Sequence, residues 1–581
     1  MHSGKIFFFS PVYASPREEG RHELWRELKN ISRGMVGEWL LAGDFNDIAH
    51  PSEKRGGIPA QQRRCDKFLD RINDCNLIDC GATGPKFTWR GPAFQNGDRI
   101  FERLDRALSN DDWRLGFPNA VVKVLPRVNF SDHHPMIIAL FGFDYAQRPS
   151  YFKFESAWLL EESYAEMLEA SWSGTNSIQE RLSNLAHEIK EWKNITIGSV
   201  TKKKRELLAR IGGVQKKLQT ERRNNFLFRL ENELQDELAH ILKMEELMWF
   251  QRSRAKWLVD GDRNTRYYHL KTITRRRYNK IIMLRDVHGN WVEEVEELKQ
   301  MANDYYKTLF AADGSVVNWY QTAITFPRLL DDELQMIGGV ITDDEVKRAV
   351  FSMSPWKAPG PDGFPAGFYQ KSWGIVGQSV CEFVKQVWSN PLCLRDINYT
   401  DICLIPKVDQ PETIQQFRPI SLCNTLYKVV SKVLTNRIKD TINKVVSPHQ
   451  SGFIPGRSIH ENIVVVQEMA HSMRKMNGKV GYFAVKVDLS KAYDRLSWKF
   501  IYHTLMEVGY PMEWIDVVMT SVTSVRTNVK WNGDRAEYFH PQRGIRQGDP
   551  ISPYLFVICM DKLSHLITQC VQEEAWKPMR A

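Results

Sequence analysis

Two polar side chains at the end of an apolar segment form the first candidate site. Residues 39–42 are apolar and lead into Asp44 and Asn46, and the two-residue alternation of a strand places both side chains on one face. A carboxylate and an amide together offer the oxygen ligands that hard cations prefer. An aspartate after glycine at a strand end is also typical of a turn that caps its own backbone, so both interpretations stay open.

Two further segments add an imidazole and more carboxylates. Asp132 and His133 stand just before the apolar residues 136–140. The carboxylate can bind a metal, and an imidazole titrates near neutrality, which suits proton transfer. Asp105 can supply a carboxylate that orients His133. The alternatives are a polar loop for the histidine segment and a helix-surface ion pair for the segment around Asp105.

A third candidate lies near residue 490. The apolar residues 482–487 predict a buried strand that ends at Asp488, and residues 490–509 have helical periodicity. A carboxylate exposed at the end of such a strand can hold the divalent cation that binds nucleotide phosphates. The alternative is an aspartate that caps the following helix.

Positive charge is concentrated in the middle of the chain. The 581 residues carry 79 Lys and Arg against 70 Asp and Glu, a net charge of +9, yet residues 181–280 alone contain 24 basic and 12 acidic residues. Basic and aromatic residues alternate between 249 and 280, and Arg275, Arg276 and Arg277 are consecutive. Guanidinium groups bind phosphates and rings stack on bases, which favours nucleic-acid binding over a solvated helix face.

The elements that position these residues differ along the chain. Residues 1–145 predict short strands separated by turns, with an amphipathic helix at 62–76. Residues 146–335 predict a basic helical connector, and residues 336–581 return to a mixed pattern with Pro and Gly clusters. The expected fold class is therefore α/β and α+β in several domains, as the length also requires.

Composition argues against secretion and membrane insertion. The sequence shows no run of the ~18 to 20 consecutive apolar residues that a membrane span needs, and its opening apolar block is too short for a signal peptide. The nine cysteines have no C-x-x-C spacing of the kind found in zinc fingers. We expect an intracellular protein, in the nucleus or the cytoplasm, with no membrane contact.

The first two candidate sites, in their order and spacing, resemble the endonuclease/exonuclease/phosphatase family. That family is a two-layer β-sandwich that cleaves phosphodiesters with Mg²⁺. The resemblance implies these roles: Asp44 and Asn46 at the attacking water and phosphate, Asp132 at the metal, His133 with Asp105 as a dyad, and Tyr13 at the phosphate. The family's first strand, with its Asn and metal-binding Glu, has no counterpart here. We therefore expect an incomplete metal site and no nuclease activity.

Five segments around Asp488 resemble reverse transcriptases of LINE-type retrotransposons, those without long terminal repeats, most closely the plant polyproteins. The segments are 357–363, 404–407, 417–422, 450–457 and 543–550. The resemblance implies polymerase fingers and a partial palm that take deoxynucleoside triphosphates, an RNA template and a DNA target or primer, with Mg²⁺. It implies these roles: Asp488 at the metal, Arg418 and Lys407 at the triphosphate, Tyr493 at the sugar, and Gln547 and Gly548 at the nucleotide and template.

The family's second aspartate pair, in a Tyr-x-Asp-Asp hairpin, has no counterpart before Ala581. One carboxylate cannot hold two divalent ions, so we expect a catalytically incompetent reverse transcriptase fragment. The alternative is a non-catalytic remnant that binds nucleic acid. An intron maturase is a third interpretation, which the upstream nuclease-like half disfavours.

Overall fold

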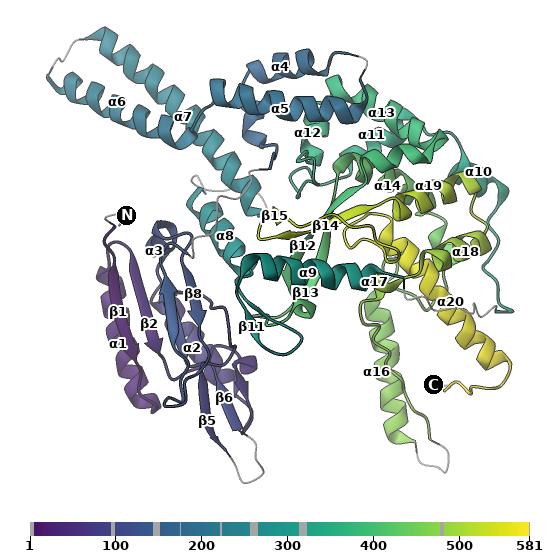
Figure 1. The fold of residues 1–581 in the computed structure, drawn as a ribbon, viewed down its shortest axis with the longest axis horizontal. Helices are drawn as coiled ribbons and strands as arrows, with labels where there is room; N and C mark the ends of the chain where they lie inside the picture. Colours follow the sequence, from purple (N-terminus) through teal and green to yellow (C-terminus); the bar gives the residue numbers. More distant parts are fainter. Residues whose placement is uncertain are drawn as a thin grey trace.

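The computed structural model describes residues 5–93, 99–142, 151–174, 176–220, 224–255, 265–312, 322–476 and 481–579. Along the chain, a strand-rich part is followed by long helices and then by a second mixed part (Figure 1). The expected boundary at 145/146 falls in 143–150, which lies outside the described residues.

The N-terminal part is built from small sheets flanked by helices. Its main sheet has the order β1-β2-β7-β4, in which β1 and β2 are parallel and the other pairs antiparallel, and β3-β6-β5 and β8-β9 form two antiparallel sheets. The elements are β1 (Phe8–Tyr13), α1 (Glu18–Gly34), β2 (Trp39–Asp44), β3 (Lys54–Arg55), α2 (Gln62–Asp74), β4 (Ile78–Asp79), β5 (Trp89–Ala93), β6 (Arg99–Glu102), β7 (Asp105–Ser109), α3 (Asp111–Gly116), β8 (Val121–Val124) and β9 (Met136–Ala139).

Strand β2 is apolar throughout because both of its faces are covered. Leu41 packs in a core with Phe68 of α2, whereas Leu40 packs in a second core with Trp113 of α3. A strand buried on two faces reads as a continuous apolar run and not as an alternating one. Helix α2 confirms the amphipathic helix predicted at 62–76.

The middle of the chain is helical, as predicted. Helices α6 and α7 pair along their lengths and project from the body of the molecule (Figure 1). The elements are α4 (Ser163–Trp172), α5 (Ile178–Thr196), α6 (Val200–Thr220), α7 (Asn225–Ser253), α8 (Thr265–Tyr278), β10 (Leu284–Arg285), β11 (Trp291–Val292) and α9 (Val295–Phe310).

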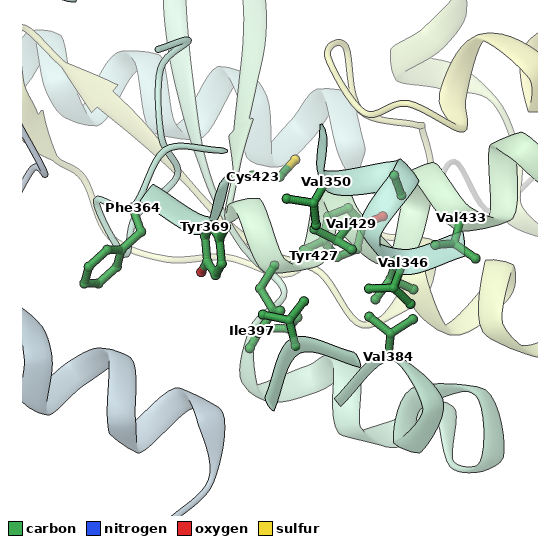
Figure 2. Packing of buried hydrophobic residues seen from close by; sticks show 14 of the residues in the cluster. Val346, Val350, Phe364, Tyr369, Val384, Ile397, Cys423, Tyr427, Val429 and Val433 are labelled. Carbon is green, nitrogen blue, oxygen red and sulfur yellow. The ribbon is translucent and has the colours of Figure 1, made fainter. Parts of the chain in front are cut away.

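The C-terminal part is built around a sheet of order β13-β12-β14-β15, in which β12 is antiparallel to β13 and parallel to β14. Its elements are α10 (Asp331–Gly338), α11 (Asp343–Phe351), α12 (Ala366–Lys371), α13 (Trp373–Ser389), β12 (Tyr399–Pro406), β13 (Phe417–Cys423), α14 (Thr425–Ile438), α15 (Ile442–Val445), α16 (Ile459–Lys475), α17 (Ala492–Arg495), α18 (Trp498–Val508), α19 (Met512–Thr523), β14 (Arg526–Trp531), β15 (Asp534–Arg535) and α20 (Ser552–Gln572). Figure 2 shows Val346, Val384 and Val433 of three of these helices meeting in the main core.

The end of the helical region belongs to the core of the C-terminal part. Leu284 and Tyr306 are fully buried in one cluster with Leu404 of β12 and Trp531 of β14. The hairpin β10–β11 and helix α9 therefore complete the packing of the C-terminal sheet, although the sequence pattern groups them with the connector.

The strand predicted at 482–487 is wrong in this structure. Residues 481–489 form neither helix nor strand, and their side chains are exposed. Backbone N–H and C=O groups of a strand need a neighbouring strand, and none of the described strands pairs with this segment. Helix α16 is equally exposed, with Val465 at 56%.

Helix α20 is long and apolar overall, although Asp561 and Lys562 interrupt its apolar residues. By length and composition it is the one described helix that could cross a membrane. Leu555 and Ile558 of this helix are fully buried in the main core, which is typical of a core helix.

Candidate active sites

Three strands of the N-terminal sheet bring polar side chains into one row. Tyr13 of β1, Asp44 of β2 and Asp105 of β7 are direct neighbours across the sheet, and side chains at paired positions emerge on the same face. Tyr13 is 81% exposed, so packing at the strand end does not explain it. The start of β7 at Asp105 also excludes a helix-surface ion pair there.

Asp44 and Asn46 form one hydrogen-bonded unit. The backbone N–H and the Nδ2 of Asn46 donate to the two carboxylate oxygens of Asp44 at 2.8 and 2.7 Å, and Nδ2 also donates to the carbonyl of Ala14 at 2.8 Å. Asn46 has φ +48°, a left-handed conformation that Asn adopts readily. Burial raises the pKa of Asp44, and the neighbouring carboxylate of Asp105 adds to the rise.

The expected histidine and aspartate pair lies beside this unit. His133 Nδ1 and Asp105 Oδ2 are 2.9 Å apart. Asp132 is exposed, and its carboxylate accepts a hydrogen bond of 2.9 Å from Trp89 Nε1, which lowers the pKa of Asp132. The structure thus gathers the sequence-predicted residues of the first site at one end of the sheet.

The gathered residues do not make a complete metal site. Within the described ranges, no three His, Cys, Asp or Glu side chains lie close enough together to hold a metal ion. Asp105 is engaged by His133 and Asp44 by Asn46. A magnesium ion needs near-octahedral oxygen ligands, and this set does not fit that requirement.

A buried ion network, absent from the sequence predictions, supports β7 below the site. Arg106 has a fully buried side chain that bonds Glu53 and, at 2.8 Å, Asp79. Arg103 bonds Glu53 at 2.9 Å. Burial raises the pKa of Asp79, but Arg103 and Arg106 outweigh it and hold that pKa at about 2.

A cavity of about 500 Å³ in the C-terminal part brings together most of the residues predicted for a nucleotide site. The predicted residues that line it are Lys407, Arg418, Asp488, Tyr493 and Gln547; the lining residues that sequence reasoning did not assign include Gln450, Lys491 and Phe556. They come from β13, α17 and α20, from the segment that follows β12, and from the segments that precede α16, α17 and α20.

Three cations face this cavity. Arg418 of β13 is exposed, and Lys407 follows the paired strand β12. Lys491 has φ +57°, and within the described part of the chain its buried Nζ has no hydrogen-bond partner. Burial and the nearby Lys407 lower the pKa of Lys491. Only its position three residues after Asp488 could have signalled its role.

Tyr493 and Gln547 also line this cavity, and Gly548 follows Gln547. The ring of Tyr493 stacks on Phe556, with centroids 4.7 Å apart. The carbonyl of Gln547 accepts a 2.9 Å bond from the Ser421 N–H. Gly548 has φ +118°, and a Cβ there would lie 3.1 Å from the Ser421 carbonyl, so a glycine fits this approach to β13.

Asp488 is the only carboxylate among the residues that line this cavity, all of which the structure describes. It is exposed and belongs to the segment that forms no strand. Two divalent ions are held by more than one carboxylate. The residues present therefore do not fit a two-metal centre.

Comparison with known proteins assigns both regions. Residues 4–133 match the endonuclease/exonuclease/phosphatase family, and residues 405–575 match the reverse transcriptase (RNA-dependent DNA polymerase) family. The chain joins a nuclease-family domain to a reverse transcriptase domain.

Two curated relatives match long parts of this chain. The Transposon TX1 uncharacterized 149 kDa protein of Xenopus laevis is 24% identical over 96% of this chain and 43% of the relative. The Retrovirus-related Pol polyprotein from type-2 retrotransposable element R2DM of Drosophila melanogaster is 27% identical over 48% of this chain and 26% of the relative. The chain is homologous to these non-long-terminal-repeat retrotransposon polyproteins and spans less than half of their length.

The arginines of α8 lie between the nuclease-family and reverse transcriptase domains. Arg275 donates to the carbonyls of Arg252 and Ser253, at 2.6 and 3.1 Å, and so ties α8 to the end of α7. Arg276 is exposed. Arg277 has a buried Nη1 without a hydrogen-bond partner in the described part of the chain.

Proposed function

We propose that this chain is the nucleotide- and template-binding part of a LINE-type, plant-type RNA-directed DNA polymerase, with an upstream nuclease-like domain, and that it catalyses neither reaction as it stands. The observation that carries the proposal is the cavity in which Lys407, Arg418 and Lys491 face Asp488. Three cations suit a triphosphate, while one carboxylate is too few for two-metal polymerisation.

Each lining residue has a part in binding. Arg418 and the two lysines would offset the charge of a deoxynucleoside triphosphate. Tyr493, held by Phe556, would lie against the sugar, and the backbone at Gln547 and Gly548 would border the base and the template. Mg²⁺ would supply charge neutralisation at Asp488, but the set is incomplete and no chemical step follows from it.

A non-catalytic nucleic-acid-binding protein is the second candidate. It is favoured by the lack of a three-ligand metal cluster in the described residues of either domain. Both proposals share RNA and DNA as partners and therefore a place in the nucleus or the cytoplasm. They differ in whether the cavity binds nucleotides.

We expect the full chain to bind a fluorescent deoxynucleoside triphosphate but to extend no primer on an RNA template with Mg²⁺. Arg418→Ala should weaken nucleotide binding about tenfold or more, because a hydrogen bond to a charged group is lost. Arg395→Ala is the control, since Arg395 is exposed and lies outside the cavity. Primer extension would contradict the proposal that the chain does not polymerise. Equal nucleotide binding by wild type and Arg418→Ala would contradict the proposal that this cavity binds the nucleotide.

The nuclease-like domain should not nick supercoiled plasmid in Mg²⁺. The reason is its incomplete ligand set, and the assay compares the full chain with His133→Ala. The two proteins should show the same background. Nicking by the wild type that His133→Ala or Asp44→Ala abolishes would show that the site is active.

A further inference from the structure

A second cavity, of about 820 Å³, is lined by eight Lys and Arg side chains. Its lining residues come from α8, from the C-terminal sheet and from the N-terminal part. Its lining includes Asn119 of the nuclease-family domain and Phe141, which follows that domain, and it shares no lining residue with the nucleotide cavity. The cations that line it are Lys153, Arg254, Arg275, Arg276, Arg277, Lys280, Lys530 and Arg535.

No Asp or Glu is among the described residues that line this cavity. Lys530 and Arg535 are held from behind by the buried Asp401 of β12, at 2.8 and 3.0 Å. By contrast, Lys153, Arg254 and Arg276 form no ion pair with any described residue. The cavity therefore carries positive charge that no described acidic side chain neutralises.

The excess charge perturbs the groups that carry it. Desolvation, with Arg275 nearby, lowers the pKa of Arg254 to about 10. Desolvation and the neighbouring cations Lys530 and Arg276 lower the pKa of Lys153. Like charges held together in partly desolvated positions destabilise a protein unless an anion binds between them.

The walls also carry aromatic surface beside the cations. Tyr151 and Phe152 line the cavity, and the Arg535 guanidinium lies 4.2 Å from the centroid of the Tyr151 ring. Cations mixed with rings suit a strand whose phosphates and bases are both exposed. A free polyphosphate would use the cations alone.

We infer that this cavity binds the sugar-phosphate backbone of a single nucleic-acid strand at the junction of the nuclease-family domain, the connector and the reverse transcriptase domain. The inference rests on the proposed nucleic-acid binding and assigns it to one place in the fold. The cations come from the connector and the reverse transcriptase domain, and Asn119 of the nuclease-family domain lines the same cavity. A bound strand would therefore contact all three parts and hold the nuclease-family domain against the reverse transcriptase domain.

The test compares two charge-matched double variants of the full chain. Lys153→Gln/Arg276→Gln removes two unpaired cations of the cavity, and Arg205→Gln/Arg210→Gln removes two exposed cations of α6. The probe is a labelled oligouridylate, titrated at several salt concentrations. The cavity variant should bind about tenfold more weakly at low salt, and its salt dependence should be flatter by about 0.7 per lost phosphate contact.

Further measurements separate binding from folding. Without RNA, the cavity variant should melt no lower than wild type, because repulsion between cations is relieved. With RNA, hydrogen exchange should slow in segments 151–153, 273–280 and 530–535 of the wild type. Inorganic tripolyphosphate is the second probe, and protection of these segments by it but not by RNA would overturn the assignment to a nucleic-acid strand.

The outcomes distinguish the two proposals. If wild type binds no RNA at low salt, nucleic-acid binding itself fails. If wild type binds RNA but both double variants lose affinity equally, binding is spread over the connector and the cavity assignment fails.

Discussion

Replacement of Asp549 with alanine is expected to lower the free energy of unfolding of the reverse transcriptase domain by about 3 to 5 kcal/mol. Asp549 is 3% exposed and accepts hydrogen bonds from Tyr427, at 2.7 Å, and from Ser431. It also pairs with the buried Arg546 at 3.2 Å. Its removal leaves a buried guanidinium and two hydroxyls without this acceptor, and urea-induced unfolding measures the loss.

The control for this change is Asp516→Ala, because Asp516 is exposed on α19. Its effect should stay within about 0.5 kcal/mol. Asp549 also fixes the turn that carries Gln547 and Gly548. Equal stability of Asp549→Ala and wild type would show that this network does not support the turn.

Arg106→Met should lower the free energy of unfolding of the nuclease-family domain by a similar amount, about 3 to 5 kcal/mol. The substitution leaves the buried Glu53 and the partly buried Asp79 with Arg103 as their remaining arginine partner. Hydrogen exchange of β2 and β7 in the full chain locates the loss. Arg26→Met is the control, since Arg26 is 60% exposed and its ion pairs are on the surface.

The decrease in the free energy of unfolding caused by Arg106→Met should depend on pH. The lowered pKa of Asp79 in the folded protein contributes stability that is present above its unfolded value of 3.8 and is lost as pH falls toward 2. The difference between wild type and variant should therefore be largest at neutral pH and shrink below about pH 4. A difference that grows on acidification would contradict the assigned network.

Local pattern pointed to the polar residues of the first candidate site, and their expected roles came from the family resemblance. Asp44 ends β2, whereas Asn46 lies beyond the strand with φ +48° and joins Asp44 through hydrogen bonds. The pairing of β7 with β2 brings Asp105 and His133 beside them. The network of Arg106 and Glu53 could not be predicted, because its members are distant in the sequence and meet only after the strands pair.

The second site shows where pattern fails. The apolar residues 482–487 favour a strand, but the sequence pattern does not show whether a second strand lies beside them. The left-handed backbone of Lys491 and the stacking of Tyr493 on Phe556 depend on tertiary packing. The basic cavity was foreseen only in α8, since Lys153, Arg254 and Arg535 reach it from separate segments.

Helix α9 and the β10–β11 hairpin limit where domains can be exchanged between related retrotransposons. Because Leu284 and Tyr306 fill the core beneath β12 and β14, a polymerase transplanted from residue 336 onward would expose that apolar surface to water. Recombination that joins a new upstream domain must therefore cut before residue 281 to keep this core covered. The segment from residue 281 through α9 and the C-terminal sheet are therefore expected to be inherited as one unit.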